Sequence, residues 1–138
     1  MKSRDTFLRL KRFQAEEKRR RVTQLEMMIT EFNRMAGELH KEIAAEEQRA
    51  RISDPSHFAY PTYARAARNR RDNLVSSMEE LKGQLDEAKL RLDEAMAEVS
   101  KAESLEGRDR SSDRMHEVVR AADMGANLGM MGLRAARA

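Results

Sequence analysis

Adjacent carboxylates are the first residues in this sequence whose type and spacing suggest chemistry. They stand as pairs at Glu46-Glu47, Glu79-Glu80, Asp86-Glu87 and Asp93-Glu94. Two neighbouring carboxyl groups divide acid and base roles only where a pocket pushes their pKa values apart. With 37% charged and only 4% aromatic residues, the sequence has little material for a compact core around such a pocket. We expect these carboxylates to be solvated or paired with cations on another helix.

Other residue types give no stronger sign of catalysis. The three histidines, His40, His57 and His116, are scattered, and no phosphate-binding glycine loop, metal-ligand cluster or nucleophile motif is present. The absence of cysteine excludes disulfides and thiolate metal sites, and it fits a reducing compartment such as the cytoplasm. The sequence predicts a non-enzymatic protein with no cofactor, no metal and no small-molecule substrate.

Basic residues are clustered near the start of the sequence. They are Arg9, Lys11, Arg12, Lys18, Arg19, Arg20 and Arg21. We expect some of these arginines to pair across a helical hairpin with Asp86, Glu87, Asp93 and Glu94. The surplus predicts an acidic or polar partner surface.

Two heptad ladders indicate the elements that must position these side chains. Apolar residues recur at alternating steps of three and four, which is the spacing of a coiled-coil seam. The strongest seam positions are Val22, Leu25, Ile29, Phe32, Leu39, Ile43, Leu74, Met78, Leu81, Leu85, Leu92 and Val99. Upstream of Val22 the same register gives Leu8, Lys11, Ala15 and Lys18, whereas Phe7, Leu10 and Phe13 supply an offset apolar strip, so we expect a register shift there.

The distribution of charge favours pairing of the two ladders within one chain. Successive segments ending at residues 21, 50, 78, 106 and 138 carry net charges of +6, −3, +3, −5 and +2. An antiparallel hairpin sets segments of opposite sign side by side, whereas a parallel homodimer would set like charges together. The sequence therefore predicts an all-α fold, a long antiparallel two-helix coiled-coil hairpin with a short, mobile C-terminal helical tail.

Domain boundaries follow from the turn and tail residues. We predict a hairpin over 1–106, with one helix at about 3–52, a turn at 53–61 where Pro55 and Pro61 stand, and a second helix at about 62–106. Residues 107–138 are predicted to be a linker, a short amphipathic helix and a flexible tail. Tail methionines suit an adaptable docking surface. At the hairpin tip, three aromatic residues either plug the apolar end or form an exposed contact for a partner: Phe58, Tyr60 and Tyr63.

These features together resemble one known family, the FliJ-type proteins of the bacterial flagellar type III export apparatus. The resemblance covers about residues 1–105 and rests on the heptad helices, the aromatic break and three motifs. The motifs are Phe7-Leu8-Arg9-Leu10-Lys11-Arg12-Phe13, Glu16-Glu17-Lys18-Arg19-Arg20-Arg21 and Arg68-Asn69-Arg70-Arg71-Asp72-Asn73-Leu74.

The resemblance implies a cytoplasmic stalk protein, peripherally associated with the inner-membrane export apparatus. Its implied partners are the ring of the export ATPase, the export gate membrane protein and substrate chaperones. The basic residues from Arg9 to Arg21 would contact the ring. Two alternatives are a general coiled-coil scaffold or chaperone outside secretion and, less favoured, a basic coiled-coil nucleic-acid binder.

Overall fold

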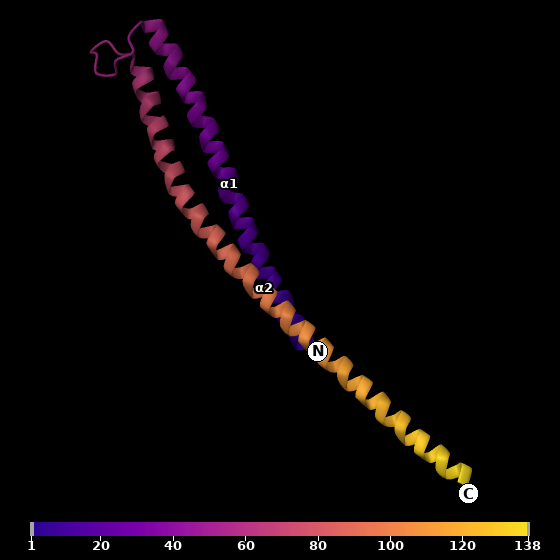
Figure 1. Cartoon of the computed structure of the whole chain (residues 1–138). Coiled ribbons are helices and arrows are strands. Elements are labelled where there is room, and N and C mark those ends of the chain that lie inside the picture. The colour runs from indigo at the N-terminus through magenta and orange to yellow at the C-terminus, as the bar shows by residue number, and fades with distance from the viewer. Residues whose placement is uncertain (1, 138) are drawn as a thin grey trace. The chain divides into compact units, whose positions relative to one another are not determined.

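Two long helices make up the fold. The computed structural model describes the backbone of residues 2–137 and the side chains of residues 3–125. Helix α1 spans Lys2–Ala50 and helix α2 spans Thr62–Arg137 (Figure 1). The predicted all-α helical hairpin is confirmed. The chain divides into two compact units, Gln14–Ala95 and the combination of Met1–Phe13 with Met96–Ala138.

The two helices run antiparallel within each unit. In the unit Gln14–Ala95, Arg21 of α1 contacts Gln84 of α2, and Glu42 of α1 contacts Tyr63 of α2. The residue numbers therefore rise on α1 and fall on α2 toward the turn. In the other unit, Arg4 pairs with Asp109 and Lys11 lies near Glu98, so the partner numbers on α2 again fall as the numbers on α1 rise. Both sets of contacts follow the antiparallel pairing that the alternating charge blocks predict.

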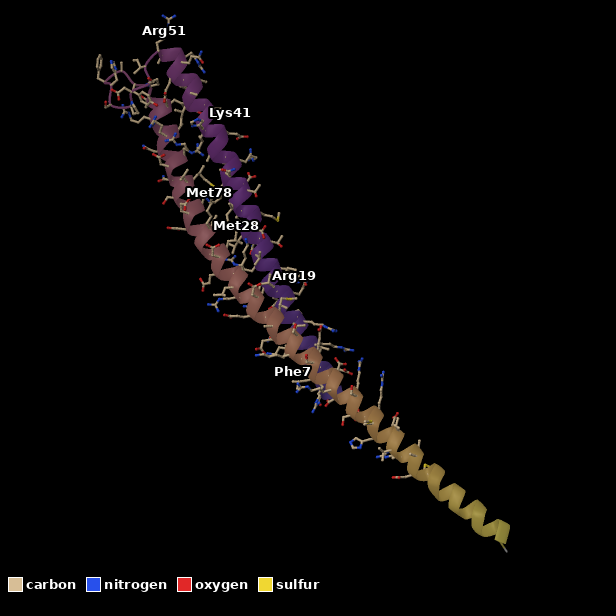
Figure 2. The ribbon with its side chains drawn as sticks, viewed as in Figure 1. Phe7, Arg19, Met28, Lys41, Arg51 and Met78 are labelled. Atoms are coloured by element: carbon tan, nitrogen blue, oxygen red, sulfur yellow. The ribbon has the colours of Figure 1, made fainter. Side chains whose placement is uncertain are left out.

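The seam is a single row of apolar side chains from each helix. Leu25 is the most deeply buried large side chain, at 1% exposure, and it clusters with Val22, Leu81 and Ala88. Met78 is also buried (Figure 2). The twelve strongest seam positions from the sequence are all buried or half-buried, including Ile29, Phe32, Leu39, Ile43, Leu74, Leu85, Leu92 and Val99.

The expected register shift near the N-terminus is wrong. Leu8 and Ala15 are each 5% exposed and continue the register of Val22, whereas Phe7, Leu10 and Phe13 are 45–55% exposed. Lys11 occupies its seam position half-buried because its aliphatic stem tolerates an apolar surface while its ammonium group reaches Glu98. A lysine stem therefore costs the seam less than a slip in register would.

Helix α1 ends two residues earlier than the sequence predicts, and hydrogen bonds explain where. The backbone nitrogen of Ile52 donates to the carbonyl of Glu47, and that of Arg51 donates to the carbonyl of Gln48. These two bonds form a Schellman motif, which requires a left-handed residue after the last helical one. Arg51 fills that position with φ of 57°. The helix therefore stops before Ser53-Asp54-Pro55 is reached.

Helix α2 contradicts the predicted linker after residue 106. It continues through Gly107 and the segment 108–113 to Arg137 without a break. Glycine lowers helix propensity but does not terminate a helix unless the backbone turns left-handed, and no described glycine has a positive φ. The segment predicted as a linker is therefore helical. The predicted flexibility of the tail concerns mainly residues 126–138, whose side chains lie outside the described residues.

Candidate partner-binding site

Three of the seven predicted contact cations lie in the unit that contains the N-terminus. The Lys11 ammonium group is 3.9 Å from a Glu98 carboxylate oxygen and 5.3 Å from the centre of the Phe7 ring. Arg12 donates a 3.3 Å hydrogen bond to Glu103. Arg9 is exposed and forms no ion pair or hydrogen bond within the described residues. Of these three cations, Arg9 retains its full capacity for an external partner.

The other four cations lie in the unit Gln14–Ala95. Lys18 and Arg20 are exposed and form no ion pair or hydrogen bond within the part of the chain that is described. Arg19 lies 4.0 Å from Glu16. Arg21 donates to two neutral amide oxygens, those of Gln24 at 3.1 Å and Gln84 at 3.3 Å. Within the described residues, Lys18, Arg20 and Arg21 have no carboxylate partner.

The expected pairing of the arginines with Asp86, Glu87, Asp93 and Glu94 is wrong. Each of these acids follows a seam residue, Leu85 or Leu92, by one or two positions, and all are exposed. Because a helix turns about 100° per residue, such positions face away from the partner helix. Glu87 instead pairs with Arg91 of its own helix at 2.9 Å. The acids that do reach across to α1 are Glu98, Glu103 and Asp109.

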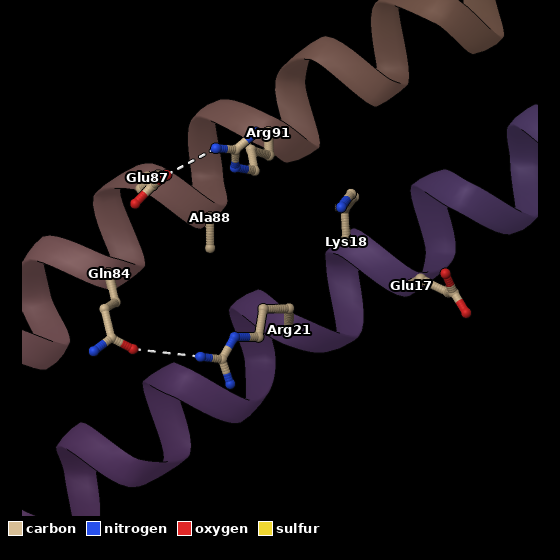
Figure 3. Close-up of a pocket in the computed structure, with 7 residues that line it drawn as sticks. All are labelled: Glu17, Lys18, Arg21, Gln84, Glu87, Ala88 and Arg91. Carbon is tan, nitrogen blue, oxygen red and sulfur yellow. Dashed lines mark hydrogen bonds and ion pairs between the residues drawn. The ribbon is translucent and has the colours of Figure 1, made fainter.

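A hollow between α1 and α2 adjoins the unneutralised cations. It has a volume of about 380 Å³ and is lined by Glu17, Lys18, Arg21, Gln84, Glu87, Ala88 and Arg91 (Figure 3). Lys18 stands at a seam position, and among seam positions from Leu8 to Ala50 it alone is exposed. On the α2 wall the seam residue is Ala88, whose small side chain leaves space between the helices. Sequence reasoning assigned Lys18 and Arg21 to a contact but missed Gln84, Ala88 and Arg91.

A larger depression nearby is a weaker candidate. It measures about 560 Å³, and its lining, which includes Arg19, Arg20, Met27 and Met28, comes from α1 alone. One helix cannot supply two facing walls, so this depression is an open surface rather than a site that encloses a ligand.

The three tip aromatics separate into different environments. Tyr60 is 4% exposed and donates a 2.9 Å hydrogen bond to Glu47, so it plugs the end of the seam. Phe58 is 95% exposed and stacks on His57 with ring centres 4.8 Å apart. Tyr63 is 55% exposed and donates a 2.7 Å hydrogen bond to Glu42, and this bond to a carboxylate raises the pKa of the Tyr63 phenol. Of the three, Phe58 is the most exposed.

Exposed apolar residues gather in the unit that contains both chain ends. Beside Phe7, Leu10 and Phe13 of α1, several side chains of α2 are 40–68% exposed, namely Met96, Leu105, Met115, Val118, Val119 and Met124. From Arg110 to Gly125 every residue of α2 is exposed. The predicted docking role of the tail methionines is thus compatible with the exposure of Met115 and Met124.

Chemical sites of other kinds are not found in the described part of the protein. No three histidine or acidic side chains among residues 3–125 come together where they would hold a metal ion. Neither helix, over the residues described, includes a segment that is long and apolar enough to cross a membrane. Charged side chains and exposed apolar side chains are the features that the described surface presents.

Comparison with known proteins leaves the family open: no protein-family model, curated protein or solved structure matches this chain.

Proposed function

We propose that this protein is a non-enzymatic coupling or stalk component of the flagellar type III protein export apparatus. In this role the hairpin binds the ring of the export ATPase and promotes its assembly and activity, and it engages the export gate and substrate chaperones. The protein acts in the cytoplasm, at the periphery of the inner-membrane apparatus. This proposal extends the resemblance carried by the basic and heptad motifs of residues 1–105.

The observation that carries the proposal is the set of cations on α1 without acidic partners. Arg9, Lys18 and Arg20 form no ion pair or hydrogen bond within the described residues, and the hydrogen bonds of Arg21 go to neutral amide oxygens. A cation left unpaired on a rigid helix attracts an acidic surface and accelerates encounter with it. The uncommitted cations thus support the contact with the ring that the resemblance implies.

The hairpin would influence catalysis indirectly. A binding partner shifts an enzyme between conformations only by contacting one of them more favourably than another. The protein would favour the assembled, active ring in this way, while the ATPase supplies all the catalytic groups.

A charge reversal tests the proposed contact. The double variant Arg9→Glu/Arg20→Glu changes two exposed cations whose reversal breaks no internal ion pair. We expect it to lose capture of the export ATPase in a pull-down and to lose stimulation of ATP hydrolysis. Lys41→Glu/Lys89→Glu is the matched control, because it reverses two exposed cations that likewise form no ion pair or hydrogen bond within the described residues.

The control variant distinguishes loss of a specific contact from a general effect of reversing two charges. Loss of stimulation in the Arg9/Arg20 variant with retention in the Lys41/Lys89 variant supports the proposal. Equal stimulation by all three proteins would remove the proposed ring contact. Failure of the unmodified protein to bind the ATPase would leave the general scaffold outside secretion as the better reading.

A further inference from the structure

At Lys18, beside the hollow, the row of buried and half-buried seam side chains of α1 is interrupted. Ala15 and Val22, the neighbouring seam residues of α1, are buried at 5% and 7% exposure, yet Lys18 between them is exposed. Across the hollow, Ala88 is too small to fill the space that a larger seam residue would occupy. A charged residue at a seam position specifies a structure at a cost in stability. A cost of this kind indicates a role other than packing.

The charges around the hollow do not cancel. Lys18 forms no ion pair or hydrogen bond within the described residues, and the Arg21 guanidinium is held between two amide oxygens. The Arg91 guanidinium binds Glu87 at 2.9 Å. Figure 3 shows Lys18 and Arg21 extending toward α2, while Glu17 turns away from it. The hollow therefore presents two cations without a carboxylate partner, supported by an Arg91–Glu87 pair.

We propose that this hollow binds a single carboxylate side chain from an acidic segment of a protein partner. The ammonium of Lys18 and the guanidinium of Arg21 would donate charge-assisted hydrogen bonds to the carboxylate oxygens. The inference rests on the proposed function and deepens it, because it names the group of the partner that the basic segment receives.

The charge of the lining favours a single carboxylate group over a phosphate dianion. Three cations and two acids line the hollow, which leaves a net charge of +1. A phosphate dianion would bring a second negative charge close to Glu87. Gln84 holds the Arg21 fork with a neutral oxygen, so an incoming carboxylate meets a positioned donor that is not already neutralised.

Two variants close the hollow from opposite walls. Lys18→Leu removes the ammonium group and restores an apolar seam residue, and Ala88→Leu fills the space without changing any charge. The control Lys89→Gln removes an exposed positive charge one position beyond Ala88 and outside the lining. All three are made in the full-length chain.

The test uses N-acetylated hexaglutamate as the probe. Amide signals of the isotopically labelled full chain are followed by nuclear magnetic resonance, with inorganic phosphate at equal ionic strength as the second arm. We expect shifts confined to the segments around Lys18, Arg21 and Ala88. Binding should be about tenfold weaker in Lys18→Leu, since one charge-assisted hydrogen bond is of that size. Ala88→Leu should weaken binding by a similar factor, because the larger side chain occupies the space that the carboxylate would enter. Lys89→Gln should change the dissociation constant by less than about twofold, because exposed charges contribute little.

Three outcomes would overturn the inference. They are unchanged binding in both Lys18→Leu and Ala88→Leu, an equal loss in Lys89→Gln, and tighter binding of phosphate than of the peptide. The peptide test does not involve the export ATPase, so it can fail while the Arg9/Arg20 experiment still succeeds. Conversely, a hollow that binds the peptide in a protein that ignores the ATPase would place the site in a different partnership.

Discussion

The phenolic hydroxyl of Tyr60 donates a 2.9 Å hydrogen bond to a carboxylate oxygen of Glu47, tying the turn to the last part of α1. Arg68 of α2 lies 3.4 Å from the same oxygen. The three side chains close the seam at the tip, where Tyr60 is the buried member.

Removing the Tyr60 hydroxyl should destabilise the hairpin. Tyr60→Phe keeps the ring in place but leaves the Glu47 oxygen with Arg68 alone, so we expect the free energy of unfolding to fall by about 1 kcal/mol. Urea denaturation followed by circular dichroism measures it. Tyr63→Phe is the control, because its hydroxyl bonds Glu42 on an exposed surface, and it should change stability much less than Tyr60→Phe does. Equal effects would contradict the distinction between plug and surface tyrosine.

Tyr63 should titrate at higher pH than an ordinary tyrosine. Its hydrogen bond to the Glu42 carboxylate favours the protonated phenol and raises the pKa of Tyr63. The stabilising contribution is therefore complete below the ordinary tyrosine pKa and is lost as pH rises through the raised value. In the Tyr60→Phe protein Tyr63 is the sole tyrosine, and its ultraviolet absorbance reports ionisation directly. Adding Glu42→Gln should lower the pKa of Tyr63, and an unchanged titration would refute the assignment.

Glycine at position 51 should stabilise the protein. Arg51 holds a left-handed conformation with φ of 57° at the end of α1, where a Cβ atom costs free energy that glycine avoids. We expect Arg51→Gly to raise the free energy of unfolding by about 1 kcal/mol. Arg49→Gly, two residues earlier and inside α1, should instead lower it by a similar amount. Changes of the same sign in both variants would be inconsistent with the described end of α1.

Alanine at position 107 tests whether α2 continues beyond the predicted hairpin. Gly107 is helical, and a Cβ atom there would meet no other atom within 4 Å. Gly107→Ala should therefore stabilise helical structure by about 0.5–1 kcal/mol, measured as added helicity and a higher melting temperature. Gly83→Ala is matched, since Gly83 has the same open surroundings in the middle of α2. A gain in Gly83→Ala alone would mean that residue 107 lies in a linker after all.

The centre of the seam should be the most sensitive packing position. Leu25 is 1% exposed, so Leu25→Ala should cost about 2–5 kcal/mol through lost contacts and the space left behind. Met27→Ala, on the outer face at 68% exposure, should stay within about 0.5 kcal/mol of the unmodified protein. Thermal unfolding compares the two. Comparable destabilisation by both would show that the seam is not where the heptads place it.

The sequence could specify the seam because its signal is periodic and strong. Val22 and Leu25 are separated by three positions and Leu81 and Leu85 by four, which are the two alternating steps of a heptad. The buried cluster follows this heptad register. The antiparallel direction could also be predicted, because only that direction sets segments of opposite net charge side by side. Periodicity says less where apolar residues offer two strips, as Phe7, Leu10 and Phe13 compete with Leu8 and Ala15. The stronger hydrophobicity of the aromatic strip was misleading, because an extended lysine stem at Lys11 lets the existing register continue.

The candidate site was predictable only in part. The cations Lys18 and Arg21 stand out in the sequence, but the hollow depends on Ala88 and Gln84, which carry no signal of their own. Individual ion pairs could not be predicted either. Glu98 and Glu103 reach α1 while Asp86 does not, because position around the helix decides access and net segment charge does not report it.

In the unit Gln14–Ala95 each helix contributes a single row of side chains to the interior. Its stability is therefore the sum of contributions from successive layers of seam residues. Layers that share no contacts can open separately, and the free energy of each opening reflects its immediate neighbours. Backbone amides beside Leu25 should consequently exchange their hydrogens with solvent far more slowly than those beside Lys18, where the seam position has no buried side chain.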